Sequence, residues 1–160
     1  MFLIPVTLLP KSSLTRAICG VSLQTFVALH IYQLHGLAEM HLGAWEGLTP
    51  EEVDARFDDS YQRWRERPSS VVIPEAEPLD AFRERVRRTF GKIVSGLGDG
   101  EHVIVSHGGV IAALLADALA ADYDELIRRL RLDNAGITAL EFGTGLPHVL
   151  WVNSISHLTS

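Results

Sequence analysis

A histidine followed by two glycines stands between two apolar segments in the second half of the chain. Ser106-His107-Gly108-Gly109 follows the compact apolar run His102–Val105 and leads into the apolar segment Val110–Ala121. The run is typical of a buried strand and the segment of a helix. The strand would carry His107 to the edge of a sheet, the glycines permit a tight turn, and the helix start offers free N–H groups to an anion. Taken alone, the pattern also fits a histidine that simply caps the helix.

Four other histidines give no pattern of their own. They have no neighbours at the spacings typical of metal ligands, so we expect neither a metal site nor a cofactor; these residues are His30, His35, His41 and His148.

Apolar patterning places the histidine within alternating strands and helices. Strands are expected at Val6–Leu9, His102–Ser106, Gly136–Phe142 and Val149–Val152, with helices at Val110–Ala121 and Tyr123–Leu132. Such alternation predicts an α/β fold with a largely parallel sheet and helices on both faces, a three-layer arrangement. In sheets of this kind ligands bind beyond the carboxyl ends of the strands, where His107 is expected.

Two further helices are expected between the strands. Thr49-Pro50-Glu51-Glu52 has the form of a capping box with proline at the first helical position. The helix after it should bury one stripe, formed by Val53, Phe57, Tyr61 and Trp64. After a proline-containing loop at Arg67–Pro78, Asp80 should open another helix, which buries Phe82, Val86, Phe90 and Ile93. Its arginines are expected on the solvated face rather than at a nucleic acid; they are Arg83, Arg85, Arg87 and Arg88.

Length and composition fit one domain over residues 1–160. The chain is 47% apolar and carries a formal net charge of −6. The acidic balance argues against nucleic acid and against an anionic membrane surface as partners. One cysteine, Cys19, permits no internal disulfide and fits a reducing compartment, so a cytoplasmic location is expected. The apolar runs Phe2–Leu9 and Val21–Tyr32 are too short to span a membrane and lack the features of an export signal.

Several segments together resemble the histidine phosphatase superfamily, the phosphoglycerate mutase-like proteins. The string Leu37–Gly47, followed by Thr49–Glu52, resembles the acid-loop signature of the α-ribazole phosphatase and phosphoglycerate mutase branches. Ser106–Val110 is similar to the second-histidine motif of the family. Ser12–Ala17 is similar to its Ser-Pro-Leu-x-Arg-Ala motif, with Ser13 in place of proline. Further segments fall in the family's order: Leu132-Asp133-Asn134 and Asn153 to His157-Leu158.

The resemblance implies a role for each matching residue. Arg16 would bind the phosphate, since its planar fork suits phosphate oxygens, and the alternative is a surface arginine. His107, with Gly108 beside it, would stabilise the phosphoryl group in flight. Glu39 would be the general acid that protonates the leaving oxygen, against the alternative of a solvated glutamate. Trp45 and Glu46 would shape the acid loop.

Glu77 lies near the place where the family has Gly-Glu-Ser. This chain instead has Ala76-Glu77-Pro78 there. From its position near that motif, the resemblance implies a substrate contact for Glu77.

One family feature is missing from the sequence. The family begins with a strand ending in Arg-His-Gly, whose histidine takes the phosphoryl group, and no Arg-His-Gly occurs in the chain. His35-Gly36 is only three residues before Glu39 and is rejected as the nucleophile. We therefore expect a domain without the family's first strand and helix. It is either an incomplete version of a longer protein, which we favour, or a degenerate relative with a repaired sheet.

Three functions remain open on this basis. The first is a phosphomonoesterase acting on a small phosphorylated metabolite, impaired without the nucleophile. The second is a non-catalytic protein that binds phosphate or another anion, and the third is a phosphomutase. A sheet edge left uncovered would favour pairing between chains, so a homodimer or low solubility is expected.

Overall fold

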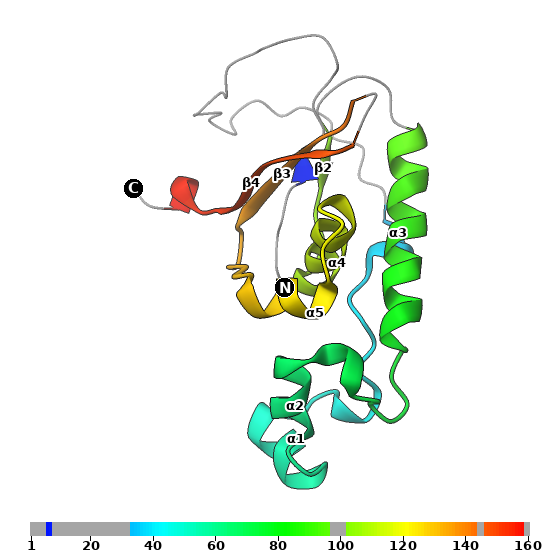
Figure 1. The fold of residues 1–160 in the computed structure, drawn as a ribbon, viewed down its shortest axis with the longest axis vertical. Coiled ribbons are helices and arrows are strands. Elements are labelled where there is room, and N and C mark those ends of the chain that lie inside the picture. The colour runs from blue at the N-terminus through cyan, green and yellow to red at the C-terminus, as the bar shows by residue number, and fades with distance from the viewer. Residues whose placement is uncertain (1–5, 8–32, 97–101, 144–145, 159–160) are drawn as a thin grey trace.

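The computed structural model describes residues 6–7, 33–96, 102–143 and 146–158. Four strands, five α-helices and several short 3-10 turns make up these residues (Figure 1). The strands are β1 (Val6–Thr7), β2 (Val103–Ile104), β3 (Ile137–Glu141) and β4 (His148–Ser154). The helices are α1 (Pro50–Arg56), α2 (Ser60–Glu66), α3 (Leu79–Gly96), α4 (Gly108–Ala118) and α5 (Tyr123–Arg129).

The described strands form one sheet in the order β2-β1-β3-β4. The pair β1–β3 is parallel, whereas β1–β2 and β3–β4 are antiparallel. The α/β class is confirmed, but the expected predominance of parallel pairing is not found among these strands. For β3–β4 the reason is the connection: residues 142–147 are too few for the crossover that a parallel pair requires. Helical cover on both faces of the sheet stays a prediction, as does the single-domain assignment.

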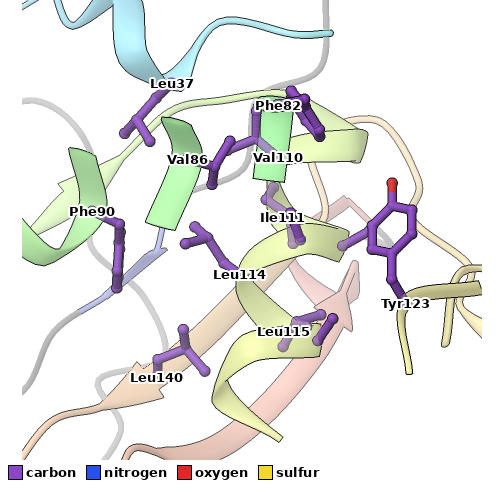
Figure 2. Packing of buried hydrophobic residues seen from close by; sticks show 13 residues of the cluster. Leu37, Phe82, Val86, Phe90, Val110, Ile111, Leu114, Leu115, Tyr123 and Leu140 are labelled. Atoms are coloured by element: carbon purple, nitrogen blue, oxygen red, sulfur yellow. The ribbon is translucent and has the colours of Figure 1, made fainter. Parts of the chain in front are cut away.

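The main core forms where α4 packs between α3 and the sheet. Helix α4 contacts α3, α5 and β4. Its apolar residues are buried on every side, including Val110, Ile111, Leu114 and Leu115. They meet Phe82, Val86 and Phe90 of α3 and Leu140 of β3 (Figure 2). The stripe predicted for the helix that Asp80 opens is thus confirmed, with Ile93 partly buried at its end.

The helix expected after Thr49 is divided into two. Thr49 and Glu52 form the predicted capping box, with hydrogen bonds of 2.8 and 3.3 Å. The chain then leaves the helix at Asp58 and Asp59, which both have positive φ. Asp54 Oδ1 accepts the N–H groups of Tyr61 and Gln62, at 2.7 and 3.2 Å, and so starts α2. A carboxylate that accepts the N–H groups of a new helix start competes with continuation of the first helix. The spacing of the apolar stripe does not show this competition.

Other boundaries differ from the predictions by a few residues. Strand β2 has two residues instead of five, and Val103 and Val105 are exposed. Helix α4 begins at Gly108 rather than Val110, because His107 is its N-cap. The predicted strand Val6–Leu9 is described only at β1, and Ser12–Ala17 lies outside the described residues. None of the helices in the described ranges is long and apolar enough to cross a membrane.

We predict that Leu115→Ala lowers the free energy of unfolding by about 2–5 kcal/mol, because it opens a cavity in the main core. The side chain is 1% exposed. Urea unfolding of the purified chain measures the loss. Leu146→Ala is the matched control, because Leu146 is 83% exposed and should change stability by no more than about 0.5 kcal/mol. Equal losses in the two variants would contradict this core.

Candidate active site

His107 stands at the junction that the sequence predicted. It is the N-cap residue of α4, with extended backbone angles of φ −116° and ψ 163°. It therefore occupies the capping position that the alternative interpretation predicted, but its side chain makes no capping hydrogen bond. The side chain is half-buried and leaves the first N–H groups of α4 open to another acceptor.

Glu39 supplies that acceptor. Its Oε2 atom accepts the N–H of Gly109 at 3.1 Å, and its Oε1 atom accepts the N–H of Met40 at 2.9 Å. A carboxylate is stabilised at this place by the partial positive charge of the helix N-terminus. Glu39 and Gly109, which lie seventy positions apart in the sequence, are thus brought together at one helix end. Glu39 is also exposed, so a ligand could reach it.

The segment 35–47, called the acid loop below, is tied to the end of β2. Leu37 is buried in the main core, and its carbonyl oxygen accepts the Ser106 hydroxyl at 2.8 Å. This hydrogen bond is itself buried, where an unpaired carbonyl would be costly. Ser106 therefore links the acid loop to the residue just before His107.

The far end of the acid loop is anchored by Trp45. This side chain is 5% exposed and has three aromatic neighbours, with ring centroids at 6.2–6.5 Å. The neighbours come from the link after α1 and from α2: Phe57, Tyr61 and Trp64. Glu46 Oε1 also accepts the N–H of Leu42 at 3.2 Å. These contacts support the prediction that Trp45 and Glu46 shape the loop.

Gly43 lets the acid loop pack closely against the loop before α3. It has a φ of +51°, and a Cβ there would lie 2.3 Å from the carbonyl oxygen of Pro74. The next residue, Ala44, donates its N–H to that same oxygen at 2.9 Å. Only glycine meets both requirements without strain.

Glu77 is paired with an arginine of α3. Arg85 donates from Nε to Glu77 Oε1 at 2.8 Å and from Nη2 to Oε2 at 2.7 Å. These hydrogen bonds lower the pKa of Glu77, with the charge of Arg85 adding to the effect. The same hydrogen bonds raise the pKa of Arg85. The substrate contact implied for Glu77 stays a prediction, but both of its carboxylate oxygens already have a partner.

Arg85 was not foreseen as part of this site. It was expected on a solvated helix face, yet its side chain is only 22% exposed and contacts several backbone carbonyls of the acid loop. Its place on the helix offered a signal, because Arg85 borders the buried stripe between Phe82 and Val86. The four arginines of this helix, taken together, favoured a solvated face instead.

Tyr123 lies close to the charges of Glu39 and Arg83. Burial raises the pKa of Tyr123 to about 12, and the negative charge of Glu39 adds to the rise while Arg83 opposes it. The Arg83 guanidinium lies 5.2 Å from the centre of the Tyr123 ring. The phenol is therefore a neutral hydroxyl at ordinary pH.

Arg16, the predicted phosphate ligand, lies outside the described residues. Among the residues that are described, no three His, Cys, Asp or Glu side chains gather in a way that could hold a metal ion.

Two further segments of the family's order meet on the sheet. The Asn153 amide donates to Asp133 Oδ2 and accepts the N–H of Asp133, both at 2.8 Å. The hydrogen bond from Asn153, with that from Arg131, lowers the pKa of Asp133. Asn153 thus fixes the entry to β3 against the end of β4.

A cavity of about 790 Å³ lies between α1, α2 and α5. Tyr61, Trp64 and Arg128 are among its lining residues. Neither Glu39 nor His107 lines it, so it is separate from the site described above.

In this α/β fold the acid loop thus meets the N-terminus of α4, where Glu39 and the N-cap residue His107 lie. The chain belongs to the histidine phosphatase superfamily (branch 1), whose family model matches residues 4–155.

Three similar proteins illustrate the relationship. Bifunctional protein Rv2228c of Mycobacterium tuberculosis is 34% identical over 150 residues, which cover 92% of this chain and 41% of that protein. The structure of Bacillus stearothermophilus YhfR matches with a TM-score of 0.73 and 26% identity, over 79% of this chain and 63% of that chain. Mycobacterial glucosyl-3-phosphoglycerate phosphatase Rv2419c, in complex with inorganic phosphate, matches with a TM-score of 0.63 and 28% identity. That match covers 74% of this chain and 62% of the other.

The chain spans only part of these proteins. It covers 41% of the length of the mycobacterial protein and less than two thirds of each solved structure. The activities of these proteins are therefore not assigned to this chain.

We predict that Gly109→Ala displaces the Glu39 carboxylate with little effect on folding. The new Cβ would lie 2.4 Å from Glu39 Oε1, and the flexible end of that side chain can move away. Stability should change by no more than about 1 kcal/mol, because alanine is the better helix former. Crystal structures of the variants test this. Gly108→Ala is the control, since a Cβ there meets nothing within 4 Å. An unmoved Glu39 carboxylate in Gly109→Ala would contradict the geometry.

We also predict that the Glu77–Arg85 pair contributes stability that is lost in acid. The folded state lowers the pKa of Glu77 below its ordinary value of 4.5, so protonation favours the unfolded chain. The contribution is present above about pH 4.5 and disappears as the pH falls through the lower, folded pKa. Thermal unfolding between about pH 3 and 7 measures it.

Glu77→Gln and Arg85→Met should each flatten this acid dependence. Arg87→Met is the matched control, because Arg87 lies on the same helix with 62% of its side chain exposed. An acid dependence in Glu77→Gln as steep as that of the unaltered chain would refute the assignment.

Proposed function

We propose that this chain provides the phosphate-binding and acid groups of a phosphomonoesterase that acts on a small phosphorylated metabolite without a cofactor. One observation carries the proposal: the Glu39 carboxylate lies at the N-terminus of α4, where His107 is the N-cap. The two residues that the family resemblance assigns to the acid and to the phosphate pocket are therefore neighbours in space.

His107 would act on the phosphoryl group and Glu39 on the leaving oxygen. Free N–H groups at the start of α4, together with His107, would bind the phosphoryl oxygens. As the bond between phosphorus and the leaving oxygen breaks, Glu39 would give that oxygen a proton. In the family the phosphoryl group passes to the histidine of Arg-His-Gly, and because the 160 residues contain no such motif, a complete reaction would need a nucleophile from outside them. Arg16 is proposed as a further phosphate ligand.

The names of the similar proteins support a phosphatase. One of them is a glucosyl-3-phosphoglycerate phosphatase with a structure in complex with inorganic phosphate. A second relative is named phosphoserine phosphatase 1, from Hydrogenobacter thermophilus. These names describe different substrates, so the proposal for this chain stops at a small phosphorylated metabolite.

A second candidate is phosphate binding without turnover. The 160 residues contain no Arg-His-Gly, the motif that carries the nucleophilic histidine in the family. A chain that binds phosphate through α4 and His107 but attacks nothing would be a binding protein.

Location and partners follow from composition. We propose a cytoplasmic protein, because a single cysteine suits a reducing compartment, and a net charge of −6 argues against nucleic acid as a partner. A homodimer is proposed from the sheet, in which the long edge strand β4 exposes Leu150, Trp151 and Val152.

We predict that the chain binds inorganic phosphate and that His107→Gln weakens this binding about tenfold, the loss of one charge-assisted hydrogen bond. Glu39→Gln should bind phosphate at least as tightly, because it removes a negative charge from the site. Isothermal titration calorimetry measures both effects. His148→Gln is the matched control, because that side chain is 74% exposed on β4.

Hydrolysis of p-nitrophenyl phosphate tests for turnover. Turnover that Glu39→Gln abolishes, with phosphate binding retained, supports the phosphatase and excludes the binding protein. Phosphate binding without turnover is expected of the binding protein and also of a phosphatase impaired by the missing Arg-His-Gly. A chain that binds no phosphate, or binds it equally well with His107→Gln, would refute both.

A further inference from the structure

Arg85 makes more polar contacts with the acid loop than any pairing with Glu77 requires. While Nε and Nη2 face the Glu77 carboxylate, Nη1 donates to the carbonyl oxygens of Gly36 and Ala38 at 3.1 and 3.0 Å. Longer contacts of 3.4 Å reach the carbonyl oxygens of His35 and Glu39. One guanidinium thus joins α3 to four residues of the acid loop.

Glu77 orients this guanidinium. The two side chains form a fork-to-fork pair, which fixes the plane of the guanidinium as well as its position. Glu77 is itself held, because its N–H donates to the carbonyl oxygen of His41 at 2.9 Å. The carboxylate therefore aims the remaining N–H groups of Arg85 at the backbone just before and at Glu39.

The acid loop is also held by Ser106 and by the start of α4. The Ser106 hydroxyl binds the Leu37 carbonyl, and the Gly109 N–H binds the Glu39 carboxylate. The backbone that carries Glu39 therefore lies between α3 and the start of α4. Without Arg85 the carbonyl groups of Gly36 and Ala38 would lose these hydrogen bonds to α3.

We propose that Arg85, oriented by Glu77, is a positioning residue that sets the Glu39 carboxylate against the N-terminus of α4. The functional meaning of this role rests on the proposed function, in which Glu39 is the acid. Glu77 then acts through Arg85 and need not touch the substrate.

The Gly109 amide gives a direct signal of where Glu39 lies. In a chain labelled with 15N-glycine, Glu39→Gln should move the Gly109 amide resonance, because the acceptor loses its charge. The resonance is identified by its loss in Gly109→Ala. In an Arg85→Met background, the same Glu39→Gln change should move the resonance by roughly half as much or less, because coupled residues are not additive.

Arg87→Met provides the matched background, since Arg87 is an exposed arginine on the same helix and pairs with Glu84. There the displacement of the Gly109 resonance should be as large as in the unaltered chain. A general loss of stability from Arg85→Met would appear in thermal unfolding and would not by itself uncouple Glu39 from Gly109.

An equal displacement in the Arg85→Met and unaltered backgrounds would overturn the proposal. If Arg85→Met fails to fold, Arg85→Lys takes its place, because lysine keeps the charge but cannot serve the carboxylate and the carbonyls together. An undiminished displacement in Arg85→Lys overturns it as well. A chain that binds no phosphate would remove the proposed function, and this measurement would still decide the position of Glu39.

Discussion

The acid loop is held in place by side-chain donors rather than by regular secondary structure. His35–Leu37 form a single 3-10 turn, so the carbonyl groups around it have few backbone partners. Arg85 and Ser106 donate to those carbonyls from two different elements. This constraint places Glu39 beside α4, and the geometry of the site depends on it.

Helix α4 unites the core and the site. Its residues Val110–Ala116 are buried on all sides, so the helix is fixed by packing against α3, α5 and the sheet (Figure 2). Its first two residues, Gly108 and Gly109, carry no side chain, and the Gly109 N–H donates to the Glu39 carboxylate. A helix terminus with this support offers that carboxylate a hydrogen-bond donor in a fixed position.

A second, smaller core serves the other end of the acid loop. Trp45 packs among Phe57, at the end of α1, and the aromatic side chains of α2, and these two helices lie away from the sheet (Figure 1). Its indole Nε1 is buried without a hydrogen-bond partner, which costs free energy that the aromatic packing offsets. The loop is thus anchored in the main core at Leu37 and in this cluster at Trp45, with Glu39 between them.

The sequence by itself determined the elements whose signals are local. The Thr49 capping box, the buried stripe of α3 and the strand-to-helix turn at His107 all follow from residues within a few positions of one another. The family motifs also indicated Glu39 and His107. Only the tertiary structure decided that Asp54 starts a second helix and which carbonyls of the acid loop Arg85 contacts. Those outcomes depend on which carbonyls and carboxylates come within hydrogen-bonding distance after folding, and the spacing of residues along the chain does not specify these partners.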